Sequence, residues 1–122
     1  MTLMLACCEK PRGASPEEQV MTAAETYYSY LVNEQPDSFL KGRYGMDNIP
    51  ESFRKALINR YKQFADDQKK NHGGIVKIKA TNVKDDSLLQ LTQVFLNLIF
   101  ADSTREEIVI PMVKDGDTWK MK

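Results

Sequence analysis

The stretch "KKNHGGIVKIKATNV", residues 69–83, contains the point at which the periodicity of the chain changes. Before the Gly-Gly pair, apolar residues recur at intervals of three and four, as they do along one face of a helix. After it, Val76, Ile78 and Ala80 alternate with lysine and threonine, which is the two-residue period of a strand with one solvated face. The sequence therefore predicts helices before Gly74 and strands after it.

Two long helices and a short one are expected before this point. Ser15 and Glu18 form a capping box, with Pro16 in the first helical position, and predict a helix of about 17 residues that ends before Pro36. Residues 36–45 predict a short helical turn and a loop. The second long helix is expected from about residue 50 to about residue 70. Its expected cap is Asn48, and its apolar face consists of Phe53, Leu57, Tyr61 and Phe64.

Four strands are expected after Gly74. The first begins at Ile75, and "DDS" turns the chain into the apolar run "LLQLTQVFLNLIFA", residues 88–101. Periodicity alone does not distinguish a buried helix from a strand in such a run, but its position between turns favours a strand. "EEIVIPMV" and the Asp-Gly hairpin of "KDGDTWKMK" complete the set. Helices followed by strands predict an α+β domain, residues 16–122, with the helices on one face of a curved four-stranded antiparallel sheet.

Both faces of the predicted strand 88–101 are largely apolar, which suggests two binding surfaces. One face carries the amides of Gln93 and Asn97, which need partners if they are buried. They predict a pocket for a small apolar ligand, or else they pair with each other or lie at a solvated edge. The candidate pocket residues are Tyr27, Tyr61, Gln93, Asn97 and Trp119. The other face predicts an interface for a homodimer or a partner protein, formed by Val94, Leu96, Leu98 and Phe100.

The composition argues against several kinds of chemistry. Lys+Arg and Asp+Glu both number 17 and are interspersed, so no clustered basic excess points to nucleic acid. The lone histidine, His72, lies in an apparent turn and is interpreted as a solvated loop residue. No His/Cys set has the spacing of a metal site, and no nucleophile motif or phosphate-binding glycine loop is present. We therefore expect no catalytic residues, no metal and no cofactor.

The N-terminal stretch "LMLACCEKPRGASPEE", residues 3–18, holds the two cysteines of the chain, Cys7 and Cys8. Adjacent cysteines cannot close a useful loop, so they are either incidental thiols or a lipidation signal. "LMLAC" resembles the end of a bacterial lipoprotein signal peptide, with Cys7 as the modified residue and Cys8 as the alternative. Only six residues precede Cys7, fewer than a signal peptide needs. Either the reading frame is longer or the resemblance is accidental.

On the first interpretation, residues 1–15 are a truncated signal remnant and a polar tether. The expected location is then the bacterial cell envelope, with the membrane contacted through the lipid anchor alone.

The order of elements, with "YLVNEQPDSF", the lysine-rich second helix and "IPMVKDGDTWKMK", resembles the cystatin-like, nuclear-transport-factor-two-like superfamily. More closely, it resembles the small secreted bacterial domains related to the lumazine-binding-like lipoproteins. The resemblance implies a cone in which a long helix crosses a curved sheet. It leaves activity open, because one scaffold hosts both enzymes and binding modules. The favoured hypothesis is a non-enzymatic binding domain, and the alternative is an isomerase or hydratase that uses the cone cavity.

Overall fold

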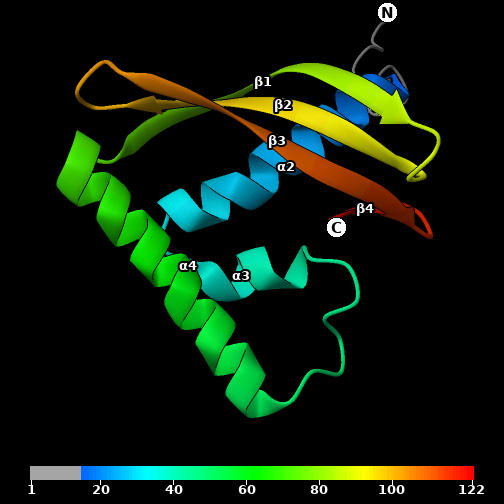
Figure 1. Ribbon diagram of the computed structural model, residues 1–122, viewed down its shortest axis with the longest axis horizontal. Helices are drawn as coiled ribbons and strands as arrows, with labels where there is room; N and C mark the ends of the chain where they lie inside the picture. The colour runs from blue at the N-terminus through cyan, green and yellow to red at the C-terminus, as the bar shows by residue number, and fades with distance from the viewer. Residues whose placement is uncertain (1–14) are drawn as a thin grey trace, which may run out of the picture.

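The structure, a computed structural model, describes residues 15–122 as an α+β fold. Cys7 and Cys8, on which the lipidation hypothesis rests, lie outside the described residues. Within these residues three helices come first and a four-stranded sheet follows (Figure 1). None of the described helices is long and apolar enough to cross a bilayer. The elements are α2 (Pro16–Val32), α3 (Pro36–Lys41), α4 (Glu51–His72), β1 (Ile75–Asp86), β2 (Leu91–Phe100), β3 (Arg105–Asp115) and β4 (Thr118–Met121).

The helix ends follow from local chemistry, with one correction. Ser15 Oγ accepts from the Glu18 amide at 3.1 Å and Glu18 Oε1 accepts from the Ser15 amide at 3.0 Å, so the predicted capping box is confirmed. The predicted Asn48 cap of α4 is wrong. The N-cap is Pro50, whose extended backbone leads directly into the helix, so Asn48 lies too far out to reach the free amides. α4 ends at Gly73, which has the left-handed φ of 80° that glycine adopts without strain.

The sheet is an antiparallel meander in the order β1-β2-β3-β4. The strand interpretation of residues 88–101 is confirmed for Leu91–Phe100, but the turn before it is longer than expected. Asp86 Oδ1 accepts from the Leu89 amide, and Gln90 has a φ of 56°, so residues 87–90 form the turn. β4 forms the edge of the sheet opposite β1. There the Tyr44 amide donates to Met121 O, and the Met121 amide donates to Gly42 O, both at 2.7 Å. The loop after α3 therefore covers the free edge of β4.

The core lies between the sheet and α2, which crosses its inner face (Figure 1). The residues predicted to form an interface lie in this core: Val94, Leu96 and Leu98 are 0% exposed and Phe100 is 2% exposed. The prediction that they form an interface on the outer face of the sheet is therefore wrong. The sequence could not decide between the faces because both are apolar. The inner face is the one that meets the apolar stripe of α2, formed by Val20, Ala24 and Leu31.

α2 forms the helical layer against the sheet, and α3 and α4 form a second layer. Aromatic rings join the two layers. Tyr28 of α2 meets Phe39 of α3 edge to face at a centroid distance of 5.1 Å, and Phe39 meets Tyr61 of α4 at 4.7 Å. α4 touches the sheet near the start of β1 and runs away from it (Figure 1). Phe53, near the outer end of α4, is consequently 47% exposed. The sequence placed it on the apolar face of this helix, but it does not join the core.

Candidate functional site

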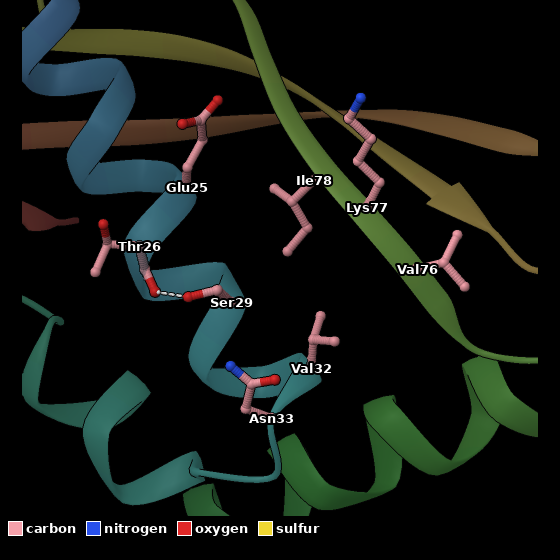
Figure 2. A pocket seen from close by; sticks show the side chains of 8 residues that line it. All are labelled: Glu25, Thr26, Ser29, Val32, Asn33, Val76, Lys77 and Ile78. Carbon is pink, nitrogen blue, oxygen red and sulfur yellow. Dashed lines mark hydrogen bonds between the residues drawn. The ribbon is translucent and has the colours of Figure 1, made fainter.

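A groove lies between α2 and the edge strand β1, with a cavity volume of about 340 Å³ (Figure 2). The two elements converge because α2 packs on the inner face of the sheet beside β1. One wall is a helix and the other is a strand with an unpaired edge. We call this the α2–β1 groove. It is lined by Glu25, Thr26, Ser29, Val32 and Asn33 of α2 and by Val76, Lys77 and Ile78 of β1.

The groove has an apolar middle and polar ends. Figure 2 shows Ile78 projecting from β1 toward α2, with Val32 below it and Glu25 above it. Val76 is 63% exposed at the rim, because a bulge between Ile75 and Lys77 makes it an extra residue that has no partner on β2. An apolar strip flanked by hydrogen-bonding groups is typical of sites that bind and orient a ligand.

Glu25 connects the two walls of the groove. Its Oε2 accepts from the Ala80 amide of β1 at 2.8 Å. Ser29 Oγ donates to Thr26 O at 2.6 Å within α2. The side chains of Asn33 and Lys77, in contrast, have no hydrogen-bond partner among residues 15–122. Two polar side chains at the groove are thus available to a ligand.

The edge of β1 offers main-chain groups as well. In an antiparallel ladder the amides that point away from the neighbouring strand occur at every second residue. The Ala80 amide points away from β2, since it donates to Glu25, and Ile78 therefore exposes its main chain at the same edge. The amide of Val83, beyond the second bulge, is occupied by Asn82 Oδ1 at 2.9 Å. An unpaired part of the edge, at Ile78, therefore lines the groove.

A second hollow of about 340 Å³ adjoins the first at Val32, which lines both. It lies between the end of α2, the last turns of α4 and the start of β1. Its lining is more apolar than that of the groove and includes Leu31, Phe64, Ala65 and Ile75. The two hollows together form a continuous path along which an elongated ligand can extend past the end of α2.

The five residues predicted to form one pocket do not do so. Tyr27 Oη donates to Trp119 O at 2.5 Å, and Arg43 Nη1 donates to the buried Tyr61 Oη at 3.2 Å. Burial raises the pKa of Tyr27 above its ordinary value. Gln93 and Asn97 lie on the outer face of the sheet, opposite the buried residues of β2, so they cannot meet the tyrosines. Both amides are half-exposed, but β2 is a central strand, so they do not lie at an edge of the sheet.

The sequence analysis missed a cluster at His72. Its Nδ1 lies 3.1 Å from Asp102 Oδ2, and its ring stacks on Phe100 at a centroid distance of 4.5 Å. Thr104 donates to Asp102 Oδ1 through its hydroxyl at 2.5 Å and through its amide at 3.0 Å. Those hydrogen bonds, with His72, lower the Asp102 pKa to about 2.

The cluster at His72 attaches the end of α4 to the β2–β3 turn. The Thr104 hydroxyl donates a hydrogen bond to the Asp102 carboxylate, and both groups lie on the Nδ1 side of the His72 ring. A catalytic arrangement would need a nucleophile on the other ring nitrogen. The spacing of Asp102 and Thr104 in "ADST" is typical of a capped turn. This spacing was the sequence signal from which the Asp102–Thr104 part of the cluster could have been predicted. Among residues 15–122, no group of three or more His, Cys, Asp or Glu is placed to hold a metal ion.

Comparison with known proteins supports the fold. No protein-family model matches the chain, and no curated protein matches it. Among solved structures, it is similar to a Campylobacter jejuni protein provisionally named an NTF2-like transpeptidase, with a TM-score of 0.63. The sequences are 10% identical, and the match covers 82% of this chain and 94% of the other. The chain therefore has the NTF2-like, cystatin-like α+β fold that the sequence predicted, and a likeness at this identity extends to the fold alone.

Proposed function

We propose that this chain is a non-enzymatic binding domain whose site is the α2–β1 groove, and that the ligand is an extended peptide segment. The observation that carries the proposal is the unpaired edge of β1 at Ile78, facing an apolar strip formed with Val32. A peptide that adds to a strand edge gains affinity from main-chain hydrogen bonds and specificity from pockets for alternate side chains. A groove between a helix and a strand edge supplies both.

The positions of the polar groups support binding over catalysis. An isomerase or hydratase of this fold would need a carboxylate beside a tyrosine in a shared cavity. Here the hydroxyls of Tyr27 and Tyr61 are engaged by Trp119 O and Arg43, and the Glu25 carboxylate is engaged by the Ala80 amide. The centre of the cone is filled by side chains such as Leu96, Leu98 and Met112, each 0% exposed.

The groove is tested with peptides selected from a random display library on the 122-residue chain. We expect Val76→Glu to weaken the binding of a selected peptide by about tenfold or more, because a carboxylate at the rim must be desolvated against an apolar strip. Val109→Glu is the matched control, a partly exposed valine on the outer face of the sheet. Selected peptides that tolerate Val76→Glu and lose binding with Val109→Glu would refute the site.

The cellular setting is part of the proposal. A diacylglyceryl group on Cys7, or on Cys8, would hold the domain at the bacterial envelope without a spanning helix. The support is the "LMLAC" resemblance and the polar, Pro/Gly-containing segment that follows it. Expression of the natural gene with labelled palmitate, in the wild type and in Cys7→Ser and Cys8→Ser variants, tests it. Label that is retained in a variant carrying both Cys7→Ser and Cys8→Ser would contradict lipidation at these cysteines.

A further inference from the structure

The outer face of the sheet, which α2 does not cover, concentrates positive charge that the sequence shows as dispersed. Residues paired across strands share a face, so the ladder defines this surface. Lys77 pairs with Ile99 and, through it, with Arg105, whereas Lys79 pairs with Asn97. A bulge at Thr81 shifts the alternation by one residue. Across β1 to β3, the cations that result on this outer face are Lys79, Lys84 and Arg105, together with Lys77 at the rim that this face shares with the α2–β1 groove.

These four side chains are exposed and form no ion pair with residues 15–122. One carboxylate, Glu107, lies among them, in the row of Lys79 and Asn97. The other carboxylates of the face are at its far end, beside the turns, at Asp86 and Asp115. A chain with a formal net charge of zero therefore presents one locally basic surface.

The centre of the same face is apolar. Phe95 pairs with Val109, which is 45% exposed, and Pro111 lies in the next row, opposite Gln93. The polar pair of Asn97 and Glu107 separates these residues from Ile99. These residues belong to the two central strands, while the lysines belong to the edge strand β1. The sheet curves around α2, so this face is the outward-facing side of the sheet (Figure 1). The outer face thus combines exposed apolar side chains on the central strands with cations on the β1 edge and at the start of β3.

We propose that the outer face docks on a membrane surface rich in anionic headgroups. The cations would contact headgroup phosphates while Phe95 and Val109 enter the headgroup region, which is the arrangement by which peripheral domains bind anionic bilayers. A second copy fits less well, because two outward-curving faces would touch along a line and oppose like charges. Duplex nucleic acid fits less well because the middle of the face is apolar. The inference does not depend on the peptide groove or on acylation.

The test is sedimentation of the unacylated 122-residue chain with two kinds of vesicle. One is pure phosphatidylcholine, and the other is an equal mixture of phosphatidylcholine and phosphatidylglycerol. The variant combines Lys79→Gln, Lys84→Gln and Arg105→Gln, which leaves Lys77 at the groove intact. The control removes the same net charge from the exposed surface of α4, through Lys55→Gln, Arg60→Gln and Lys70→Gln.

We expect the wild type to bind the anionic vesicles and to bind pure phosphatidylcholine far more weakly. Each cation near an anionic surface contributes about fivefold in partitioning, so the outer-face variant should lose about 100-fold and the control only a few-fold. Val109→Glu should also weaken binding, although it leaves every cation in place. Added salt should weaken binding of the wild type.

Several outcomes would overturn the proposal. Equal losses in the outer-face variant and the α4 control would mean that net charge alone matters. Equal binding to the two vesicle types would remove the role of the anionic headgroups. If the wild type does not sediment with vesicles but binds a DNA duplex through the same cations, the outer face is a nucleic-acid-binding surface. A dimer that dissociates in Val109→Glu without vesicle binding would make it a self-association surface.

Discussion

Asp102 is an exposed residue whose surroundings nevertheless determine its protonation. The hydroxyl and the amide of Thr104 both donate to its carboxylate, and His72 lies against the other oxygen. Hydrogen bonds to the charged form favour that form, which explains why the Asp102 pKa falls from 3.8 to about 2. The same carboxylate links the end of α4 to the β2–β3 turn, so its ionisation is coupled to the docking of that helix.

This coupling predicts the pH dependence of stability. Because the folded-state pKa lies below the unfolded one, the contribution of Asp102 is complete above about pH 4 and is lost as the pH falls toward 2. We expect Asp102→Asn to lower Tm at neutral pH, and the difference from wild type to shrink below pH 4. Thermal unfolding followed by circular dichroism at a series of pH values measures it. A difference that stays constant down to pH 2 would show that the ionised form is not what stabilises the turn.

Single residues were predictable where their partners are close in sequence. The capping box of Ser15 and Glu18 spans three positions, so it could be identified from the sequence and was confirmed. His72 could not be interpreted in the same way, because Asp102 is 30 positions away and meets it only once the sheet has formed. A histidine in a glycine-rich turn looked solvated for that reason.

At the scale of elements, the exposed edge of β1 is protected at one point by a side chain from α2. An unpaired strand edge invites pairing with another chain, and natural proteins limit that with charged side chains or with covering segments. Glu25 serves this purpose at Ala80, and Asn82 serves it at Val83. The open part of the edge at Ile78 lies in the α2–β1 groove, which is why we place the ligand there.

The Glu25 contact predicts local rather than global behaviour. We expect Glu25→Ala to speed hydrogen exchange of the Ala80 amide by about tenfold, because a protecting acceptor is lost, and to lower the free energy of unfolding by about 1 kcal/mol. Glu25→Gln keeps an acceptor oxygen and serves as the control, with exchange close to that of the wild type. Exchange measured by NMR for single amides gives the answer. Equal protection of Ala80 in Glu25→Ala would show that the carboxylate is not its acceptor in solution.

The elements themselves were largely predictable, because periodicity and breakers are local signals. The change of period at Gly74 is the boundary between α4 and β1 within a residue or two. The faces of β2 were not predictable in the same way. A strand that is apolar on both sides has no preferred orientation of its own, and α2 determines which side becomes the core. The pocket and interface assignments depended on that orientation, so Gln93 and Asn97 were placed together with residues that lie on the other side of the sheet.

At the scale of the whole molecule, the fold sorts residues that the sequence mixes. Apolar side chains of even-numbered β2 positions meet the helices, and the lysines of β1 gather on the opposite surface. Neither the balanced charge count nor the interspersed order of charges reveals this, because the sorting depends on strand register and on the bulge at Thr81. The fold class could thus be derived from the sequence, whereas the surfaces required the pairing of strands.

The orientation of β2 is the point on which both proposed surfaces depend, and two adjacent residues test it. Leu98 is 0% exposed on the inner face, and its neighbour Ile99 is half-buried on the outer one. We expect Leu98→Ala to lower the free energy of unfolding by about 2–5 kcal/mol, because it leaves a cavity that packed neighbours cannot fill. Ile99→Ala should cost less than about 1.5 kcal/mol, since water already reaches that side chain. Urea denaturation with matched m-values compares the two. If Ile99→Ala proved the costlier change, the sheet would face the helices with its other side, and the basic outer surface would not exist.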